Sequence, residues 1–491
     1  MRLFSNFSRR SLRNALWGGF SSLTPPLLQL AATPFLLHSL HSEAFGLWVL
    51  LITILAVTAV ADMGLAPATT LFVSRYRVQN LPSEVRRVAQ ASLALFVVLA
   101  LLTAGLLILT LPRLLSLLGT PDGSLDALSS SLPFFCLSVG LQLLQIVPSS
   151  IIRGYERYDL DGMLYTLSSV VMIVALCGTV YMGGGLNQML VAQSCVLGAS
   201  FGTALLVTTP LIGSRAWLVP YCSVASFKDF ASLGIYGWIQ GLSTAVFAQS
   251  DRLVVSSFLG PSMLAYYSAA LQAAQTLHSI MARSLAFLFP RFTALQYNHV
   301  AALRLFYRSM FVTTALGSAA AIALFFASSW ILHLWLGETI PKELPSVLSL
   351  LAVANAFMAT TIVPTALLLG AGQFRLGAVF SLSSGLVVSI AALALVPTYG
   401  LLGAAAAKLF FLPVSLISRV FVYHKVFGTW SWSLGIRQLL PVATALVPSI
   451  LLALVSGPQT YPEHQWHWPA LAALCGLALM WVQCRRQYGP L

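Results

Sequence analysis

Five ionisable side chains lie inside stretches of sequence that are otherwise apolar. They are Asp62, Asp251, Arg252, Arg283 and Lys408. A charge near the middle of a bilayer costs roughly 2.5–3.5 kcal/mol on insertion scales, so such a group normally faces a cavity or a charged partner. Arginine clamps phosphate oxygens in a bidentate fashion and lysine supplies a point charge. The pattern therefore predicts that Arg252, Arg283 and Lys408 bind an anionic group, such as a pyrophosphate or an acidic sugar.

Structural interpretations of the same basic residues remain open. Asp251 and Arg252 are adjacent, and a pair between them would pin two helices. Arg283 has a long stem and could instead extend its charge to the membrane interface. Neighbouring residues on a helix point about 100° apart, so Asp251 and Arg252 need not touch.

The two carboxylates, Asp62 and Asp251, are candidates for coupling to a proton or a cation. Asp62 is followed by Gly64 and Pro67, where we expect a helix to open and expose carbonyl groups. The alternative for Asp62 is a structural carboxylate that hydrogen-bonds neighbouring loops.

Uncharged polar groups and prolines extend the candidate site. The amides of Gln193, Gln240 and Gln272 would suit sugar hydroxyls, although the same groups also hold helices together in lipid. Pro25 and Pro26 remove backbone donors and bend their helix. We consider them gating residues, with bends that arise from packing alone as the alternative.

Composition identifies the elements that must carry these residues as membrane-spanning helices. The chain has 491 residues, of which 58% are hydrophobic and 8% charged, and its mean hydropathy is +0.87. These values exclude a water-soluble globular domain, and the net charge of +13 consequently does not indicate a nucleic-acid-binding protein. About fourteen segments are long enough to cross a bilayer. They are residues 15–38, 44–71, 88–110, 127–152, 162–182, 186–208, 230–258, 262–288, 309–336, 344–369, 376–396, 401–422, 438–456 and 467–484.

The distribution of basic residues predicts the orientation. Most of the 26 Lys and Arg residues fall in segments on one side of the membrane, and only Arg113 and Lys342 fall in loops of the other side. Basic residues in short loops stay cytoplasmic. The sequence therefore predicts cytoplasmic N- and C-termini in a multi-pass protein of the bacterial cytoplasmic (inner) membrane.

An internal repeat predicts two similarly oriented lobes. Three segments recur in order at an offset of 215 to 219 residues: 147–158 at 363–374, 40–48 at 259–267 and 185–193 at 400–408. Six spans separate the equivalent segments, so both copies keep the same orientation and a binding site is expected between them. We predict an all-α fold with an N-terminal lobe (1–210, helices 1–6), a cytoplasmic linker (211–229), a C-terminal lobe (230–425, helices 7–12) and two additional helices (426–491).

Motifs for enzymatic chemistry are not found. The sequence has no GxxxxGK[ST] nucleotide loop and no HExxH or other metal-ligand cluster, so we predict no catalytic residues, metal or cofactor. The six cysteines lack a CxxC pair and indicate no disulfide framework.

The chain resembles the polysaccharide transporter branch of the multidrug/oligosaccharidyl-lipid/polysaccharide exporter superfamily, close to the O-antigen and exopolysaccharide repeat-unit flippases. The resemblance lies in Phe45–Trp48, Ala61–Leu65, Asp251–Val255, Leu259–Gly260 and Tyr266–Tyr267, and it extends over the whole chain. His41 departs from the pattern, because it stands where such proteins usually carry a glycine and where the second repeat has Gly260.

This resemblance implies a flippase that translocates an undecaprenyl-pyrophosphate-linked oligosaccharide across the membrane by rocking of the two lobes. Its expected partners are the lipid-linked substrate, the bilayer, a coupling proton or sodium ion, and a glycan polymerase or glycosyltransferase. Three alternatives remain: an organic-cation or multidrug antiporter, which would prefer an acidic cavity, a membrane enzyme of glycan polymerisation or ligation, and a non-transporting scaffold.

Overall fold

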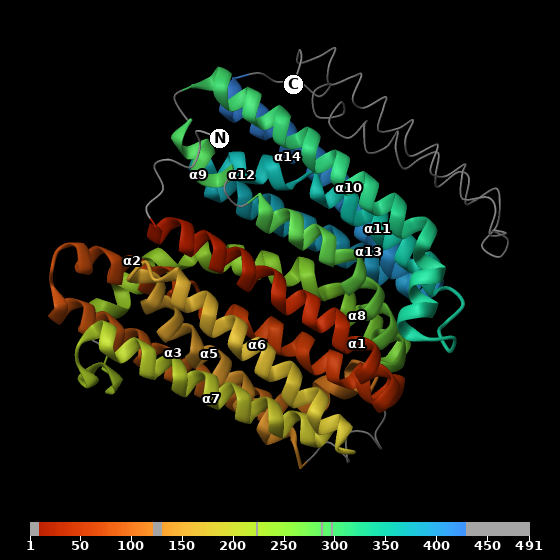
Figure 1. Cartoon of the computed structure of the whole chain (residues 1–491), viewed down its shortest axis with the longest axis horizontal. Helices are drawn as coiled ribbons and strands as arrows, with labels where there is room; N and C mark the ends of the chain where they lie inside the picture. The colour runs from red at the N-terminus through yellow and green to blue at the C-terminus, as the bar shows by residue number, and fades with distance from the viewer. Residues whose placement is uncertain (1–8, 121–129, 222–223, 286–287, 296–297, 429–491) are drawn as a thin grey trace. The chain divides into compact units, whose positions relative to one another are not determined.

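The structure is a computed structural model that describes residues 9–120, 130–221, 224–285, 288–295 and 298–428. All regular elements in this part of the chain are helices (Figure 1), which confirms the predicted all-α fold. The elements of the first half are α1 (Arg9–Thr58), η1 (Ala59–Asp62), α2 (Leu65–Val78), α3 (Pro82–Leu117), α5 (Leu132–Gly154), α6 (Tyr158–Tyr181), α7 (Leu186–Ile212) and η2 (Arg215–Leu218). Those of the second half are α8 (Val224–Ser284), α9 (Leu288–Ala294), α10 (His299–Leu336), α11 (Leu344–Ala359), α12 (Ile362–Gly370), α13 (Phe374–Ala407), η3 (Lys408–Phe410) and α14 (Phe411–Phe427).

The described helices identify a multi-pass membrane protein. Nine of their segments are long and apolar enough to cross a bilayer. Three of these, Thr24–Asp62, Gly241–Ser284 and Arg375–Val422, each overlap two of the predicted spans. The predicted spans 438–456 and 467–484, and with them the additional helices of 426–491, lie outside the described residues. The total of fourteen therefore stays a prediction.

Three helices, α1, α8 and α13, are each interrupted by one residue with positive φ. His41 (φ 61°, ψ 166°) interrupts α1, Gly260 (φ 80°, ψ 171°) interrupts α8, and Gly400 (φ 58°, ψ −137°) interrupts α13. His41 and Gly260 are equivalent in the repeat and adopt nearly the same backbone conformation. That conformation is essentially restricted to glycine, because a Cβ atom crowds the backbone there. His41 accordingly holds a strained backbone at the turn between two spans.

The chain divides into two compact units. The N-terminal unit is Met1–Ala245 with Ser256–Ala265, and the C-terminal unit is Val246–Val255 with Tyr266–Leu491. In the N-terminal unit α1 packs against α6, and α5 packs against both α3 and α7. In the C-terminal unit α10 packs against α11, α12 against α9, and α13 against α14. The boundaries of the lobes and linker given above stay predictions.

A close backbone contact in the N-terminal unit joins the turn at His41 to the turn at Gly260. A Cβ atom added to Gly46 would lie 1.8 Å from the carbonyl oxygen of Pro261. The Ser262 hydroxyl donates to the Ser42 hydroxyl at 2.7 Å beside this contact. Only glycine fits between the two turns, which gives a physical reason for Gly46 within the Phe45–Trp48 segment.

A second pair of glycines supports the internal repeat. Gly154 ends α5, and a Cβ atom there would lie 2.6 Å from Cγ1 of Val73 on α2. Its repeat equivalent Gly370 ends α12, and a Cβ atom there would lie 2.7 Å from Cβ of Phe292 on α9. The same close packing of a helix end against a shorter helix thus occurs once in each unit.

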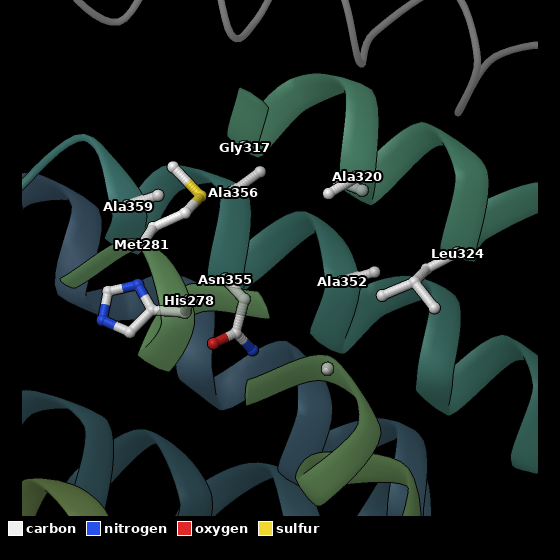
Figure 2. Close-up of a pocket in the computed structure, with 11 residues that line it drawn as sticks. His278, Met281, Gly317, Ala320, Leu324, Ala352, Asn355, Ala356 and Ala359 are labelled. Atoms are coloured by element: carbon white, nitrogen blue, oxygen red, sulfur yellow. The ribbon is translucent and has the colours of Figure 1, made fainter. Parts of the chain in front are cut away.

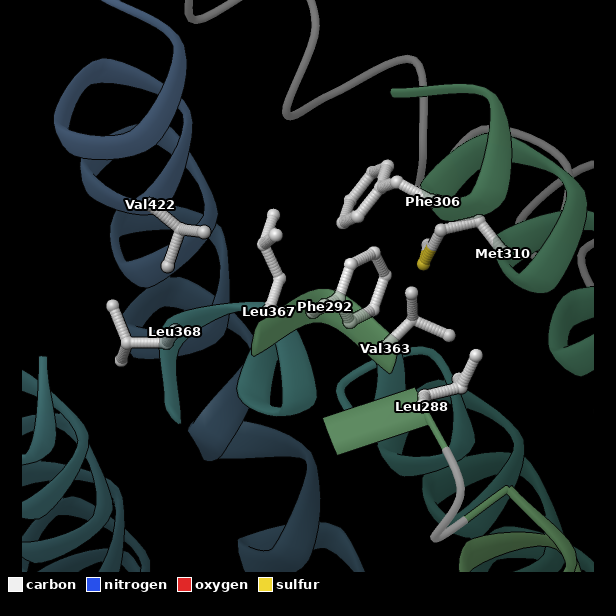
Figure 3. Packing of buried hydrophobic residues seen from close by; sticks show 8 residues of the cluster. All are labelled: Leu288, Phe292, Phe306, Met310, Val363, Leu367, Leu368 and Val422. Atoms are coloured by element: carbon white, nitrogen blue, oxygen red, sulfur yellow. The ribbon is translucent and has the colours of Figure 1, made fainter. Parts of the chain in front are cut away.

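The C-terminal unit has a well-packed apolar cluster around the short helix α9 (Figure 3). Phe292 from α9 meets Phe306 from α10 and Leu367 from α12, and all three are at most 3% exposed. The full cluster is Leu288, Phe292, Phe306, Met310, Val363, Leu367, Leu368 and Val422. Branched and aromatic side chains from four helices interlock here, and this fixes α9, α10, α12 and α14 to one another.

Candidate functional site

The C-terminal unit contains a fully buried ion pair between α8 and η3. Lys408 Nζ lies 3.0 Å from Asp251 Oδ2, and the two side chains are 3% and 0% exposed. The Tyr267 hydroxyl donates to the same carboxylate oxygen at 2.6 Å. Lys408 also donates to the carbonyl oxygen of Phe247 at 3.1 Å and lies 5.2 Å from the centre of that residue's ring. The structure therefore pairs Asp251 with Lys408 and not with its neighbour Arg252.

Local helix geometry explains why these groups meet. Phe247 and Asp251 are one turn apart on α8 and share a face of that helix. Lys408 begins η3, a short 3-10 segment between α13 and α14. The Phe411 ring meets the Phe247 ring edge to face, with centroids 6.3 Å apart. The result is a charge pair closed off by two aromatic rings.

Burial makes this pair sensitive to the loss of either partner. Removing two ions from water costs several kcal/mol per ion, and their mutual attraction offsets that cost only when the geometry is good. Asp251 Oδ1 is buried without a hydrogen-bond partner, so the carboxylate depends on Lys408 and Tyr267 through its other oxygen. A competing anion near Lys408 would leave Asp251 with an uncompensated charge.

The N-terminal unit has no equivalent pair. The repeat of 185–193 at 400–408 aligns Gln193 with Lys408. The repeat of 40–48 at 259–267, extended along the chain, aligns Ala32 with Asp251. Gln193 is 2% exposed on α7, and its Oε1 has no hydrogen-bond partner. The charged arrangement is thus particular to the C-terminal unit.

The two predicted arginines occupy different environments on α8. Arg252 is half-buried and donates to Gln249 Oε1 at 3.2 Å, while its Nε is buried without a partner. Arg283 is exposed in the last turn of α8. Binding of an anion by either residue, and an interfacial position for Arg283, both stay open.

Asp62 lies where the sequence predicted that a helix opens. Met63 (φ 50°) and Gly64 (φ 77°) adopt left-handed conformations between η1 and α2. The Gly64 N–H donates to Asp62 Oδ1, so the carboxylate satisfies a free donor at the start of α2. This contact supports the structural interpretation of Asp62, and its role in ion coupling stays a prediction.

The remaining predicted residues are placed as follows. Gln272 is half-buried on α8. Gln240 also belongs to α8, but its side chain lies outside the described residues. Pro25 is buried and Pro26 half-buried, both in the part of α1 before its interruption at His41, and gating by them stays a prediction.

Arg419 is a buried cation that the sequence analysis does not single out. It lies on α14, is 1% exposed, and donates through a terminal nitrogen to the Thr360 hydroxyl and to the Ser415 hydroxyl, the latter at 3.3 Å. Thr360 stands in the break between α11 and α12. In the sequence, Arg419 lies near the end of the predicted span 401–422, where a basic residue usually faces the membrane interface. The structure shows instead that its side chain is buried, which depends on how α14 is turned about its own axis.

A small polar hollow lies between α8, α10 and α11 in the C-terminal unit. Figure 2 shows His278 and Asn355 among the small side chains Gly317, Ala320, Ala352 and Ala356. Asn355 Nδ2 donates to the Leu351 carbonyl at 2.9 Å, whereas Asn355 Oδ1 and His278 Nδ1 have no partner. The hollow has a volume of about 10 Å³, close to the space that one water needs. Among the described residues, no group of three or more His, Cys, Asp or Glu is placed to hold a metal ion.

Comparison with protein families gives a match over more than half of the chain. Residues 11–296 match the family described as "Polysaccharide biosynthesis protein". The chain belongs to this family. The protein named "Putative O-antigen transporter" from Shigella flexneri is 22% identical over 403 residues, which cover 80% of this chain and 93% of that protein.

Solved structures with the same fold include two classes of membrane transporter. The lipid II flippase MurJ in an inward closed conformation has a TM-score of 0.67 at 12% identity, covering 96% of this chain and 99% of MurJ. An inward-facing multidrug resistance MATE family transporter of the MOP superfamily has a TM-score of 0.66 at 15% identity, covering 87% of this chain and 96% of that transporter. These similarities establish the fold. The match to the polysaccharide biosynthesis family confirms the polysaccharide transporter family that the sequence resembles.

Proposed function

We propose that the protein is a flippase that carries an undecaprenyl-pyrophosphate-linked oligosaccharide, such as an O-antigen or exopolysaccharide repeat unit, across the cytoplasmic membrane. Membership of the polysaccharide biosynthesis family and the similarity to the Shigella flexneri protein support this substrate class. The N- and C-termini are cytoplasmic in this proposal, because most basic residues lie on their side of the predicted spans.

The observation that carries the proposal is the net positive charge buried in the C-terminal unit. Lys408 and Arg419 are at most 2% exposed, and Asp251 is the one fully buried carboxylate of that unit in the described part of the chain. A buried cation whose counter-ion is a single carboxylate can exchange that partner for a phosphate oxygen. The arrangement suits a diphosphate-linked cargo.

In this mechanism the diphosphate competes with Asp251 for Lys408. Arg252, the residue after Asp251, has a buried Nε that lacks a partner and adds a second donor. Arg283, in the last turn of α8, is proposed to bind the anion separately from this pair. Asp251, once separated from Lys408, takes up a proton from one side of the membrane and releases it when Lys408 returns. Each exchange changes the charge between α8 and η3, and this biases the alternation of the two lobes.

Asp62 remains a second candidate for ion coupling, and Pro25 and Pro26 for the bending of α1 that accompanies the cycle. Gln193, Gln240 and Gln272 are proposed to bind sugar hydroxyls. A glycan polymerase or glycosyltransferase is the proposed protein partner, since the cargo must be assembled before transport and extended after it.

Transport of an organic cation is the competing proposal and fits the charges less well. A cationic drug needs a buried carboxylate that is available to it, whereas Asp251 is held by Lys408 and Tyr267. A drug would therefore have to displace a covalently tethered ammonium group. Catalysis of glycan polymerisation or ligation is a further alternative that no arrangement of described residues favours.

Export of a surface glycan tests the proposal in a bacterial strain that lacks its own copy of the gene. We expect Lys408→Met and Arg252→Gln to abolish or strongly reduce the surface glycan, with membrane abundance checked by immunoblot. Lys342→Met removes an exposed lysine and serves as the matched control, which should export normally. Normal export by both Lys408→Met and Arg252→Gln would overturn the cationic mechanism.

Reconstituted vesicles separate glycan transport from drug transport. Purified protein should translocate a fluorescent lipid-linked oligosaccharide and respond to an imposed proton gradient, and Asp251→Asn should remove that response. Accumulation of ethidium or tetraphenylphosphonium without any movement of the lipid-linked oligosaccharide would instead establish an organic-cation antiporter.

A further inference from the structure

The N-terminal unit contains a polar cavity that is separate from the ion pair of the C-terminal unit. Its volume is about 320 Å³, and four helices line it: α1, α5, α6 and α7. This volume lies at the lower end of the range for small-molecule sites, roughly 300–1,000 Å³. Pro25, a proposed gating residue, is part of the α1 wall.

The wall of this cavity is rich in groups that both donate and accept hydrogen bonds. Three amides line it, from α1 and α5, and so do four serine hydroxyls and one phenol. These residues are Gln29, Gln142, Gln145, Ser149, Ser168, Ser169, Ser200 and Tyr165. Each sugar hydroxyl is likewise both a donor and an acceptor, so amides and hydroxyls match it in either direction. Tyr165 adds an aromatic face of the kind that covers the C–H side of a sugar ring.

The charge of the cavity excludes a cation or a phosphate as its natural ligand. Asp161 is the single carboxylate in the wall. One of its oxygens accepts from the Ser149 hydroxyl, and the other pairs with Arg153 Nε at 2.7 Å. A cationic ligand would have to displace Arg153, and no lysine or arginine lines the cavity to bind a phosphate. The lining is therefore suited to a neutral ligand.

One wall residue has hydrogen-bonding capacity that the protein does not use. The Oε1 atom of Gln145 is buried and has no hydrogen-bond partner. A buried acceptor without a donor destabilises the protein, and a ligand hydroxyl inside the cavity would supply the missing donor.

The equivalent positions of the C-terminal unit do not carry amides. By the repeat offsets, the counterparts of Gln29, Gln142 and Gln145 are Ala248, Met358 and Thr361. A Cβ atom on Gly385 of α13 would lie 3.1 Å from the Phe247 amide nitrogen, so α13 lies tightly against α8 at that point. The three amides are thus particular to the N-terminal copy of the repeat.

We propose that this cavity is a saccharide-binding site that holds one neutral sugar ring through Gln142, Gln145 and Ser168, with Tyr165 beside the ring. Its chemistry follows from the lining residues, whereas its role as a holding site for one sugar of the transported glycan rests on the proposed flippase function. The diphosphate would then bind at the cations of the C-terminal unit and not here.

Saturation-transfer NMR on the purified full-length protein in lipid nanodiscs tests this assignment. The probes are methyl α-D-glucopyranoside and methyl N-acetyl-β-D-glucosaminide, with tetraethylammonium and inorganic pyrophosphate as probes of the other charge types. We expect at least one saccharide to bind, and Gln145→Leu and Gln142→Leu each to weaken its binding about tenfold, the effect of losing one good hydrogen bond.

Gln79→Leu makes the same change at an exposed site of the N-terminal unit and should leave saccharide binding unchanged. Size-exclusion profiles and circular dichroism identify variants that fail to fold. If Gln145→Leu or Gln142→Leu fails to fold, Ser168→Ala is measured in its place. Absence of binding by both saccharides to the wild type, or equal binding by Gln145→Leu, Gln142→Leu and wild type, overturns the saccharide site.

The outcome is independent of the flippase test. Saccharide binding that depends on Gln145, in a protein that exports no glycan, would support the cavity and refute the proposed function. Glycan export by a protein that binds neither saccharide would support the proposed function and refute the saccharide site.

Discussion

The buried pair of Lys408 and Asp251 gives the most demanding prediction, a thermodynamic cycle in which two harmful substitutions together are nearly harmless. Lys408→Met leaves the fully buried Asp251 carboxylate with Tyr267 as its remaining partner. Asp251→Asn leaves the ammonium group with an amide oxygen and the Phe247 carbonyl. Breaking a buried pair from one side costs about 3–5 kcal/mol, whereas replacing both members is often close to neutral.

The expected magnitudes follow from these contacts. Each single variant should lose about 3–5 kcal/mol of unfolding free energy, and the double variant Asp251→Asn/Lys408→Met should lose less than either one. Tyr267→Phe removes one charge-assisted hydrogen bond and should lose about 1.5–3 kcal/mol.

Unfolding of the purified protein in mixed micelles, by titration with a denaturing detergent, provides the measurement. Lys342→Met controls for the change in net charge, because Lys342 is exposed. Single variants that each lose less than about 1 kcal/mol, or a double variant whose loss equals the sum of the singles, would refute the reasoning, since either result means that the two charges do not depend on each other.

Four further substitutions test the turns and a helix end. His41→Gly should raise the unfolding free energy, because the relief of about 1–3 kcal/mol of backbone strain exceeds the entropic cost of glycine, about 0.5–1 kcal/mol. Gly260→Ala should lower the unfolding free energy through its backbone conformation alone, since its Cβ would meet no atom closer than 3.9 Å. Unfolding midpoints check both, and a destabilised His41→Gly would contradict the assigned strain. Gly46→Ala should prevent accumulation of folded protein in the membrane, because its Cβ would lie 1.8 Å from a carbonyl oxygen; normal abundance and stability would be inconsistent with that contact. Gly154→Ala should destabilise the protein, because its Cβ would lie 2.6 Å from Cγ1 and 2.8 Å from Cβ of Val73. Val73→Gly removes both atoms and should partly rescue the variant; an absence of rescue in the unfolding midpoint would point to the Thr70 carbonyl oxygen, 3.2 Å away, instead.

The repeat and the helical spans could be predicted because each depends on local sequence. The apolar stretches set the helices. The sequence marked His41 as a departure from the glycine found at Gly260, and the structure shows that both residues nevertheless adopt nearly the same backbone conformation. The opening of the helix after Asp62 was also predictable, because Gly64 follows it and adopts a left-handed conformation.

The partners of the buried charges could not be predicted in the same way. Lys408 and Phe247 are 161 positions apart, and their contact depends on the rotation of α8 about its axis. Arg252 was an equally reasonable partner for Asp251 on the sequence alone. Rotation of a helix is set by the packing of all its neighbours, which no short segment records.

The polar cavity was missed for a related reason. Polar residues in a membrane helix either hold helices together or line a hollow, and their types are the same in both cases. Gln142 and Gln145 on α5 were therefore not distinguishable from Gln272 on α8 until the spacing of α1, α5, α6 and α7 was known.

The contact between α10 and α11 has a consequence for movement within the C-terminal unit. These helices face each other near the His278 hollow through Gly317, Ala320, Ala352 and Ala356, and beside the hollow Ile322 of α10 packs with Val353 of α11 in a buried apolar cluster. Small side chains let the helices come close at the hollow, so a short shear step of one helix along the other meets least resistance there. The branched side chains beside the hollow and the Phe292 cluster at α9 resist a larger displacement, so movement of α10 along α11 is limited to small steps.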